Sequence, residues 1–319
     1  MGLEVRPARE EDAAGISRVH LGSVETWFRF PTEGAPVATD YEELNDAERW
    51  RNGGPWVLPS LCQAHLAWLL RVGGQAWIAT LDGEIVGEAE SFLNEEPTPL
   101  GHYLNLSVLY VQRQAQRRGV GRALLEAVRT LAVQAGCERL LIGDTEEGAH
   151  AFYARCGFSP WQSMVLARVP CGRGPATGHP FDPCGYDQVA GLPMPVGRFQ
   201  GARQEWERLR APSLRPAVLG PRRQDWRLLE VVGEPAWVVF SQSLFQSERV
   251  LLAAWTRASP DDLLPVLLAE AGALGYARAD ILLEEEAFLR LRERYALSEA
   301  GRQEAWWQRL AGVKSSSET

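Results

Sequence analysis

The sequence predicts an α/β (α+β) fold built as two related domains. Segments with the alternation of strands and segments with helical spacing follow one another through most of the chain. The length of 319 residues exceeds what one ordinary domain needs. A pattern of apolar positions also recurs at one fixed offset, which favours two copies of one unit over two unrelated domains.

Composition argues against several classes of protein. The net charge of −8 disfavours nucleic acid as a partner and favours cationic small substrates, because a negative field concentrates cations near the surface. No apolar run approaches the roughly 20 residues that span a bilayer, so no membrane partner is expected. The five cysteines lack C-x-x-C spacing, and the first residues show no basic segment followed by an apolar stretch. We therefore expect reduced thiols and a cytoplasmic protein.

The first domain is expected to open with a strand at residues 5–7 and a helix at residues 10–21. Residues 22–71 are broken by Pro and Gly, with helical pieces at 40–50 and 59–70. The aromatic side chains of this stretch either line a pocket or pack under irregular chain, and both interpretations stay open. They are Trp27, Phe28, Phe30, Tyr41, Trp50 and Trp56.

A hairpin follows, because Asp82 and Gly83 form a typical tight turn between two strand-like runs that start at residue 75 and end at residue 93. The remaining expected elements of this domain alternate between strand and helix, with Gly136 and Gly157 as helix ends. They are a strand at 102–111, a helix at 123–135, a strand at 139–143, a helix at 149–156 and a strand at 162–168.

Residues 169–220 are dense in Pro and Gly and are expected to be a connector with one helix at 200–210. Beyond it, aligning Gly275 with Gly136 places Ile281 on Ile142 and Arg294 on Arg155 without a gap. The expected division is therefore a first domain at 1–168, a connector at 169–220, and a second domain with a short C-terminal tail at 221–319.

The loop between the strand at 102–111 and the following helix has the features of an anion site. Glycines allow the backbone to approach phosphates, and the start of a helix offers unpaired N–H groups with a partial positive charge. Arginine side chains add formal charge around it. A pyrophosphate is a natural ligand, and a glycine-containing turn with a solvated basic face is the alternative. The loop consists of Gln116, Arg117, Arg118, Gly119, Val120, Gly121 and Arg122.

The order of elements over residues 3–168, with this Q-x-x-G-x-G loop and the later run from Ala149 through Phe152 and Tyr153 to Gly157, resembles the GNAT acetyltransferases. The resemblance implies two GNAT-like domains, each with a mixed, mostly antiparallel central sheet flanked by helices, and acetyl-CoA as co-substrate. The loop would hold the pyrophosphate of coenzyme A, and backbone groups of Leu109, Tyr110 and Val111 would contact the pantetheine arm.

The resemblance also implies that Tyr153 protonates the leaving thiolate, and the alternative is a core tyrosine. Two departures from the family stand out. Glu146 takes the place of a cofactor-contacting asparagine, and Asn105 and Ser107 stand where some members carry a base, although neither accepts a proton at neutral pH.

A base must therefore come from elsewhere. Glu88 and Glu90 lie two apart on a strand and so point to one face, where their proximity would raise the pKa of one of them and suit it to take a proton from an ammonium substrate. A solvated strand face is the alternative. His102 is a weaker candidate. Cys171, His179 and Cys184 match no standard zinc spacing, so no metal is expected.

In the second domain the loop equivalent runs from Trp255 to Pro260 and has no glycine. Ser259, Pro260, Asp261 and Asp262 read as a self-capped helix start that repels phosphate. We expect a degenerate copy with a structural role, which includes a possible homodimer. The predicted function is acetyl transfer to a primary amine of a small molecule or peptide by direct attack. The alternative is a non-catalytic acyl-CoA-binding regulatory or interaction protein.

Overall fold

The structure is a computed structural model that describes residues 2–31, 35–143, 145, 147–211 and 214–310. The chain forms two compact units, which do not follow the two halves of the sequence. Unit 1 comprises Met1–Leu93, Leu106–Cys137 and Ala211–Pro221, and unit 2 comprises Asn94–Asn105, Glu138–Arg210 and Arg222–Thr319. The strands β5 (Glu84–Glu96) and β6 (Gly101–Val111) contribute to both. The expected boundaries at 168 and 221 remain predictions about the repeat.

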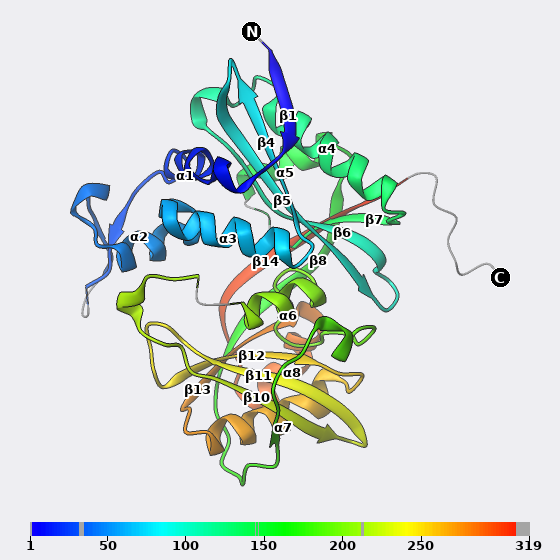
Figure 1. Ribbon diagram of the computed structural model, residues 1–319. Helices are drawn as coiled ribbons and strands as arrows, with labels where there is room; N and C mark the ends of the chain where they lie inside the picture. Colours follow the sequence, from blue (N-terminus) through cyan, green and yellow to red (C-terminus); the bar gives the residue numbers. More distant parts are fainter. Residues whose placement is uncertain (1, 32–34, 144, 146, 212–213, 311–319) are drawn as a thin grey trace, which may run out of the picture. The chain divides into compact units, whose positions relative to one another are not determined.

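In unit 1 the sheet has the strand order β1 (Leu3–Pro7), β4 (Gln75–Leu81), β5, β6, and both β1 and β5 run antiparallel to β4. The predicted hairpin is present, with Asp82 and Gly83 in the left-handed conformation. The helices α1 (Ala13–Leu21) and α3 (Pro59–Arg71) lie side by side (Figure 1).

The two faces of this sheet are covered by different helices. A Cβ added to Gly15 of α1 would meet Ile85 of β5, whereas one added to Gly87 of β5 would meet Val120 and Leu124 of α4 (Val120–Gln134). Leu124 and its apolar neighbours on α4 are buried, as the amphipathic spacing predicts. The core between the sheet and helices α1 and α3 includes Ile16, Leu66, Leu69, Ile78 and Phe92.

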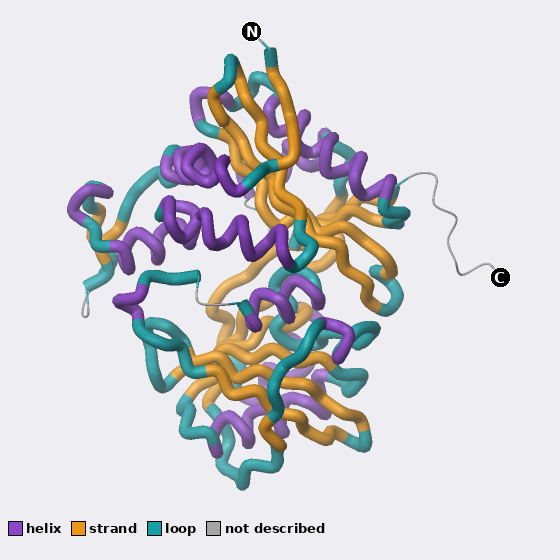
Figure 2. The backbone as a smooth tube through the Cα atoms, viewed as in Figure 1, coloured by secondary structure: helices purple, strands orange, loops and turns teal. Residues whose placement is uncertain are grey.

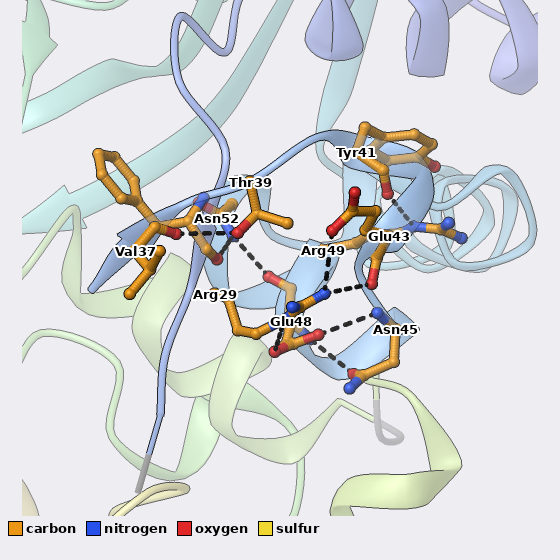
Figure 3. A network of polar contacts seen from close by, with 10 residues as sticks. Arg29, Val37, Thr39, Tyr41, Glu43, Asn45, Glu48, Arg49 and Asn52 are labelled. Carbon is orange, nitrogen blue, oxygen red and sulfur yellow. Dashed lines mark hydrogen bonds and ion pairs between the residues drawn. The ribbon is translucent and has the colours of Figure 1, made fainter. Parts of the chain in front are cut away.

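The irregular stretch between α1 and α3 is ordered by side chains that bond to backbone (Figure 3). The strand β2 (Phe28–Arg29) pairs with β3 (Val37–Ala38), and Asn52 of α2 (Asp46–Gly53) accepts from Phe28 N at 2.9 Å and donates to Phe28 O at 2.8 Å. Asn45 and Glu48 cap the start of α2 reciprocally. Two hydrogen bonds between the Asn52 side chain and the backbone of Phe28 therefore hold β2 against α2.

Unit 2 contains a second and longer run of paired strands (Figure 2). Its order is β6, β7 (Arg139–Ile142), β14 (Ser298–Arg309), β8 (Ser159–Pro170), β13 (Arg278–Glu284), β12 (Arg249–Trp255), β11 (Glu234–Gln242), β10 (Gln224–Val231), β9 (His179–Pro180). Its helices are α5 (His150–Arg155), α6 (Ala202–Arg210), α7 (Pro260–Ala273) and α8 (Glu285–Tyr295). The predicted mixed α/β class is confirmed, with β6·β7 and β12·β13 as parallel pairs.

The repeat detected in the sequence is present in the structure at the same offset. Helix α7 is the counterpart of α4, and Gly136 and Gly275 both adopt positive φ after these helices. The offset that aligns these glycines also aligns β7 with the start of β13 and both ends of β8 with both ends of β14. Each repeat therefore ends in a long strand.

These final strands are exchanged between the repeats. β8 of the first repeat pairs antiparallel with β13 of the second, and β14 of the second repeat pairs antiparallel with β7 of the first. β8 and β14 also pair with each other, from Ser298 opposite Arg168 to Trp307 opposite Ser159. Val165, Ala167 and Val169 of β8 consequently lie in the core formed by the second repeat.

Among the described helices, none has the length and apolar character needed to cross a membrane.

The strand exchange predicts that a substitution in the first repeat destabilises the second. Val165→Ala removes buried methyl groups from a closely packed core, so the free energy of unfolding should fall by about 2 kcal/mol. Hydrogen exchange should accelerate in β13 and α7, which contribute residues to the same core cluster as Val165. Val133→Ala, at an exposed position on α4, is the control and should change stability by less than about 0.5 kcal/mol. Faster hydrogen exchange that stays confined to residues 139–168 would contradict the proposed coupling between the two repeats.

Candidate functional site

The glycine-containing loop of unit 1 joins β6 to α4 and is exposed from Gln116 to Gly119. Gly119 is the N-cap of α4 with φ 87°, and Arg117 also has positive φ, at 58°. Because Gly119 has no side chain to cap the helix, the first N–H groups of α4 are offered to a ligand. A Cβ at Gly119 would meet no atom within 4 Å, so the backbone conformation is what favours glycine there.

The loop carries its positive charge on the outside. Arg117, Arg118 and Arg122 are exposed. Gln116 Nε2 donates to Val111 O at 3.3 Å, which links the loop to the end of β6. An uncapped helix start flanked by guanidinium groups fits the pyrophosphate of coenzyme A, because anions are stabilised by both features.

Glu88 and Glu90 of β5 point toward α1 and α3. The neighbouring Gly87 faces α4, so strand alternation places both glutamates on the opposite face, together with Phe92. Glu88 is 1% exposed and Glu90 is 2% exposed. The alternative of a solvated strand face is therefore wrong, because helices cover that face.

Each buried carboxylate has a histidine partner. Glu88 shares a hydrogen bond with His20 Nε2 of α1. Glu90 accepts from His65 Nε2 of α3 at 2.9 Å and from Trp56 Nε1 at 2.7 Å. His20 stacks on Trp56, with ring centroids 5.2 Å apart. We call these five residues, His20, Trp56, His65, Glu88 and Glu90, the His–Glu cluster.

Burial and nearby charges give the two carboxylates different pKa values. Burial, together with the charge of Glu90, raises the pKa of Glu88 well above its usual value. Burial also raises the pKa of Glu90, but His65 and Trp56 more than offset this effect, so the net pKa of Glu90 is lowered. Glu88 therefore holds its proton to a higher pH than Glu90 does.

The pKa values of the two histidines are also shifted in opposite directions. Burial lowers the pKa of His20 to about 4, so this imidazole is neutral at pH 7. Burial also lowers the pKa of His65, but the charge of Glu90 outweighs it and the net pKa is raised. His65 therefore keeps its proton to a higher pH than His20 does.

Two further residues of unit 1 border the cluster. The ring of Tyr110 on β6 lies 4.6 Å from the His20 ring and is 37% exposed, so it connects the cluster with the strand expected to carry the pantetheine arm. Cys62 of α3 donates to Ala13 O at 3.4 Å. Burial and then the charges of Glu88 and Glu90 raise the pKa of this thiol, which keeps it protonated.

The other predicted site residues lie in different surroundings. Tyr153 belongs to α5 in unit 2, is 7% exposed, and packs against Phe152 and Phe158. Asn105 is buried in unit 2 and donates to Gln200 Oε1 at 2.7 Å and Gln204 Oε1 at 3.0 Å. Ser107 donates to the backbone oxygen of Glu90. His102 is half-buried, and Glu146 lies outside the described residues.

Cys171 is half-buried, whereas Cys184 and His179 are exposed. Within the part of the chain that the structure describes, no three His, Cys, Asp or Glu side chains are grouped so that they could hold a metal ion.

Sequence reasoning missed the histidines of the cluster. The sequence patterns place His20 and His65 within expected helices but assign neither of them to the site. The available signal was that both lie on the apolar faces of their helices while Glu88 and Glu90 lie on one strand face. Buried ionisable groups need partners, and these two helix faces supply them.

Comparisons with known proteins identify the family of the chain. Residues 38–158 match the acetyltransferase (GNAT) family. An aminoglycoside N(6')-acetyltransferase type 1 from Stenotrophomonas maltophilia is 41% identical over 175 residues, which cover 52% of this chain and 92% of that relative.

Solved structures match both repeats. A tandem GNAT protein from the clavulanic acid biosynthesis pathway has a TM-score of 0.53 at 15% identity and covers 98% of this chain and 100% of its own. A putative acetyltransferase from Pyrococcus horikoshii has a TM-score of 0.55 at 14% identity, covering 98% and 91%. A GCN5-related N-acetyltransferase from Anabaena variabilis has a TM-score of 0.61 at 8% identity, covering 96% and 72%.

At these identities the solved structures show the fold alone, which is that of two GNAT-like repeats, whereas the relative from Stenotrophomonas maltophilia is close enough in sequence to show the family. This chain belongs to the acetyltransferase (GNAT) family.

Proposed function

We propose that the chain transfers the acetyl group of acetyl-CoA to a primary amine of a small cationic molecule. The observation that carries the proposal is that one compact unit holds both an uncapped, arginine-flanked helix start and a buried carboxylate pair with separated pKa values. The first feature suits a pyrophosphate. The second suits removal of a proton from an ammonium group.

Each group has an assigned role in this proposal. The N–H groups at the start of α4, with Gln116, Arg117, Arg118, Gly119, Val120, Gly121 and Arg122, bind the pyrophosphate, and backbone groups of Leu109, Tyr110 and Val111 align the pantetheine arm. Acetyl-CoA supplies an activated thioester. The amine nitrogen forms a bond to the carbonyl carbon as the carbon–sulfur bond breaks. The amine proton passes to the His–Glu cluster, with Glu88 as acceptor, and Tyr153 protonates the thiolate.

The acceptor class follows from charge and from the curated relative. An aminoglycoside carries several amines, and the relative from Stenotrophomonas maltophilia is named as an acetyltransferase of that class. The net charge of −8 would attract such a cation. We propose an aminoglycoside-like polyamine as the acceptor. The cytoplasmic location and the homodimer remain predictions from the sequence.

A second candidate function is acyl-CoA binding without turnover. The observation that favours it is the burial of Glu88 and Glu90, together with Asn105 and Ser107 at the positions where some family members carry a base. Release of free thiol from acetyl-CoA, measured on a panel of amines that includes aminoglycosides, separates the two. Binding without thiol release on any amine would favour the regulatory function.

Gly119→Glu should weaken acetyl-CoA binding by about 10- to 100-fold, because it places a negative charge at the helix start where charge-assisted bonds hold the pyrophosphate. Calorimetric titration measures this. Gly83→Glu is a matched control, since Gly83 has nearly the same positive φ and equally open surroundings but lies in the hairpin turn. Equal affinity in both variants would show that the pyrophosphate binds elsewhere.

Glu88→Gln should lower kcat by about 10²- to 10⁴-fold while acetyl-CoA affinity stays unchanged, because a glutamine cannot accept the proton. In the wild type, activity should rise with pH through the raised pKa of Glu88, since only the ionised form is a base. The variant should fold, because glutamine resembles the neutral acid. Glu84→Gln, exposed on the same strand, is the control. A Glu88→Gln enzyme at full rate would remove Glu88 from the mechanism.

Tyr153→Phe should reduce kcat by about 10²-fold, as expected for loss of a general acid, and should leave acetyl-CoA affinity nearly intact. The substitution keeps the ring that packs against Phe152 and Phe158, so folding is preserved. Steady-state kinetics with thiol detection provide the measurement. A normal rate in the variant would assign Tyr153 to packing alone.

A further inference from the structure

Residues 169–210 of the connector belong to unit 2, and one part of this segment lies between two strands of the second repeat. We call residues 193–197 the plug. β12 and β13 pair in parallel only from Arg249 opposite Arg278 to Leu252 opposite Ile281. Beyond that point the plug continues the hydrogen bonding of both strands.

The plug bonds to β12 on one side and to β13 on the other. Val196 O accepts from Ala254 N at 3.1 Å, and Pro193 O accepts from Thr256 N at 3.0 Å. Gly197 N donates to Leu282 O at 2.9 Å. The plug thus satisfies backbone groups of both strands where the parallel pairing stops.

The plug fits closely. Val196 is fully buried and belongs to the core of the second repeat. Gly197 has φ 81°, and a Cβ added to it would lie 2.3 Å from Leu252 O and 2.8 Å from Ala253 Cα. No larger residue fits here without a shift of backbone, so the docked arrangement selects glycine.

Strand register identifies the place that the plug occupies. Arg139 of β7 pairs with Tyr103 of β6, and Arg278, its repeat equivalent, pairs with Arg249 of β12. Arg249 is therefore equivalent to Tyr103, and Thr256 lies as far beyond Arg249 as Tyr110 lies beyond Tyr103. Pro193 O thus accepts from the amide equivalent to that of Tyr110, within the stretch assigned to the pantetheine arm.

The loop of the second repeat that corresponds to the phosphate-binding loop is also shorter. The strands β6 and β12 align at an offset of 146 residues, as from Tyr103 to Arg249, whereas the helices and later strands align at 139, as from Arg139 to Arg278. The loop before α7 is consequently seven residues shorter than the loop before α4. Ser259 Oγ accepts from Asp262 N and thereby caps α7 internally, as the sequence predicts.

We propose that the position equivalent to the acetyl-CoA slot is, in the second repeat, a binding site for the chain's own connector, with residues 193–197 as its built-in ligand. The proposal rests on the strand assignment used for the proposed function. A tethered segment has a high effective concentration at its site, so free acetyl-CoA must compete with a ligand that cannot diffuse away. The chain then binds one acetyl-CoA, in the first repeat.

The test is amide-resolved hydrogen exchange of the full chain with and without acetyl-CoA, together with calorimetric stoichiometry. The expected results are one site per chain and slow exchange at Ala254 and Thr256 that acetyl-CoA does not alter. Gly197→Ala should accelerate exchange at these two amides by about 10-fold or more, because the added methyl group displaces the plug. Gly191→Ala is the matched control, since Gly191 has φ 75° and open surroundings in the same connector.

Each outcome decides between separate claims. A stoichiometry near two, or acetyl-CoA protection of Ala254 and Thr256, would overturn the proposal. So would exchange at these amides in the wild type as fast as at surface amides, or identical exchange in the Gly197 and Gly191 variants. An absence of any acetyl-CoA binding, with slow exchange at both amides, would overturn the proposed function and leave the plug in place.

Discussion

The antiparallel pairing of β8 with β14 is the contact on which the architecture of unit 2 depends. Each strand ends one repeat and pairs on its other edge with the penultimate strand of the other repeat. Buried side chains of β8 accordingly contribute to the core that β10 to β13 and α7 enclose. A sheet edge without its partner exposes unpaired N–H and C=O groups, so neither repeat completes its sheet from its own sequence.

A second constraint acts in unit 1, where ionisable side chains are buried between β5 and two helices. Isolated buried charges are costly, and the arrangement limits this cost by giving each carboxylate a histidine partner, His20 for Glu88 and His65 for Glu90. The same burial that is costly for folding separates the pKa values of two adjacent carboxylates. A site for proton transfer needs such a separation.

Local features were predictable because they depend on neighbouring residues. The Asp82–Gly83 turn, the apolar stripe of α4 and the serine cap of α7 each follow from a few adjacent positions. The exchange of β8 and β14 was not predictable, because strand periodicity indicates that a strand has a buried face but not which strand pairs with it. The connector illustrates the same limit. Its Pro and Gly content indicates irregular chain, but does not show that residues 193–197 bond to β12 and β13.

The site was predicted in part for the same reason. The glycine loop is a continuous motif, whereas the His–Glu cluster joins α1, α3, β5 and the residue Trp56 from separate parts of unit 1. Alternation along β5 placed Glu88 and Glu90 on one face correctly but did not show that helices cover it. The shortened loop of the second repeat was hidden because one offset fits the helices and another fits the preceding strand.

The strand exchange also delays completion of the first repeat during synthesis on the ribosome. β7 ends at Ile142, but its partner β14 begins only at Ser298, more than 150 residues later. At about 5–20 residues per second, the nascent first repeat waits roughly 10 to 30 s with that edge of β7 unpaired. During this interval the unpaired edge of β7 is open to a strand from a neighbouring nascent chain, so pairing within one chain competes with pairing between chains on a polysome.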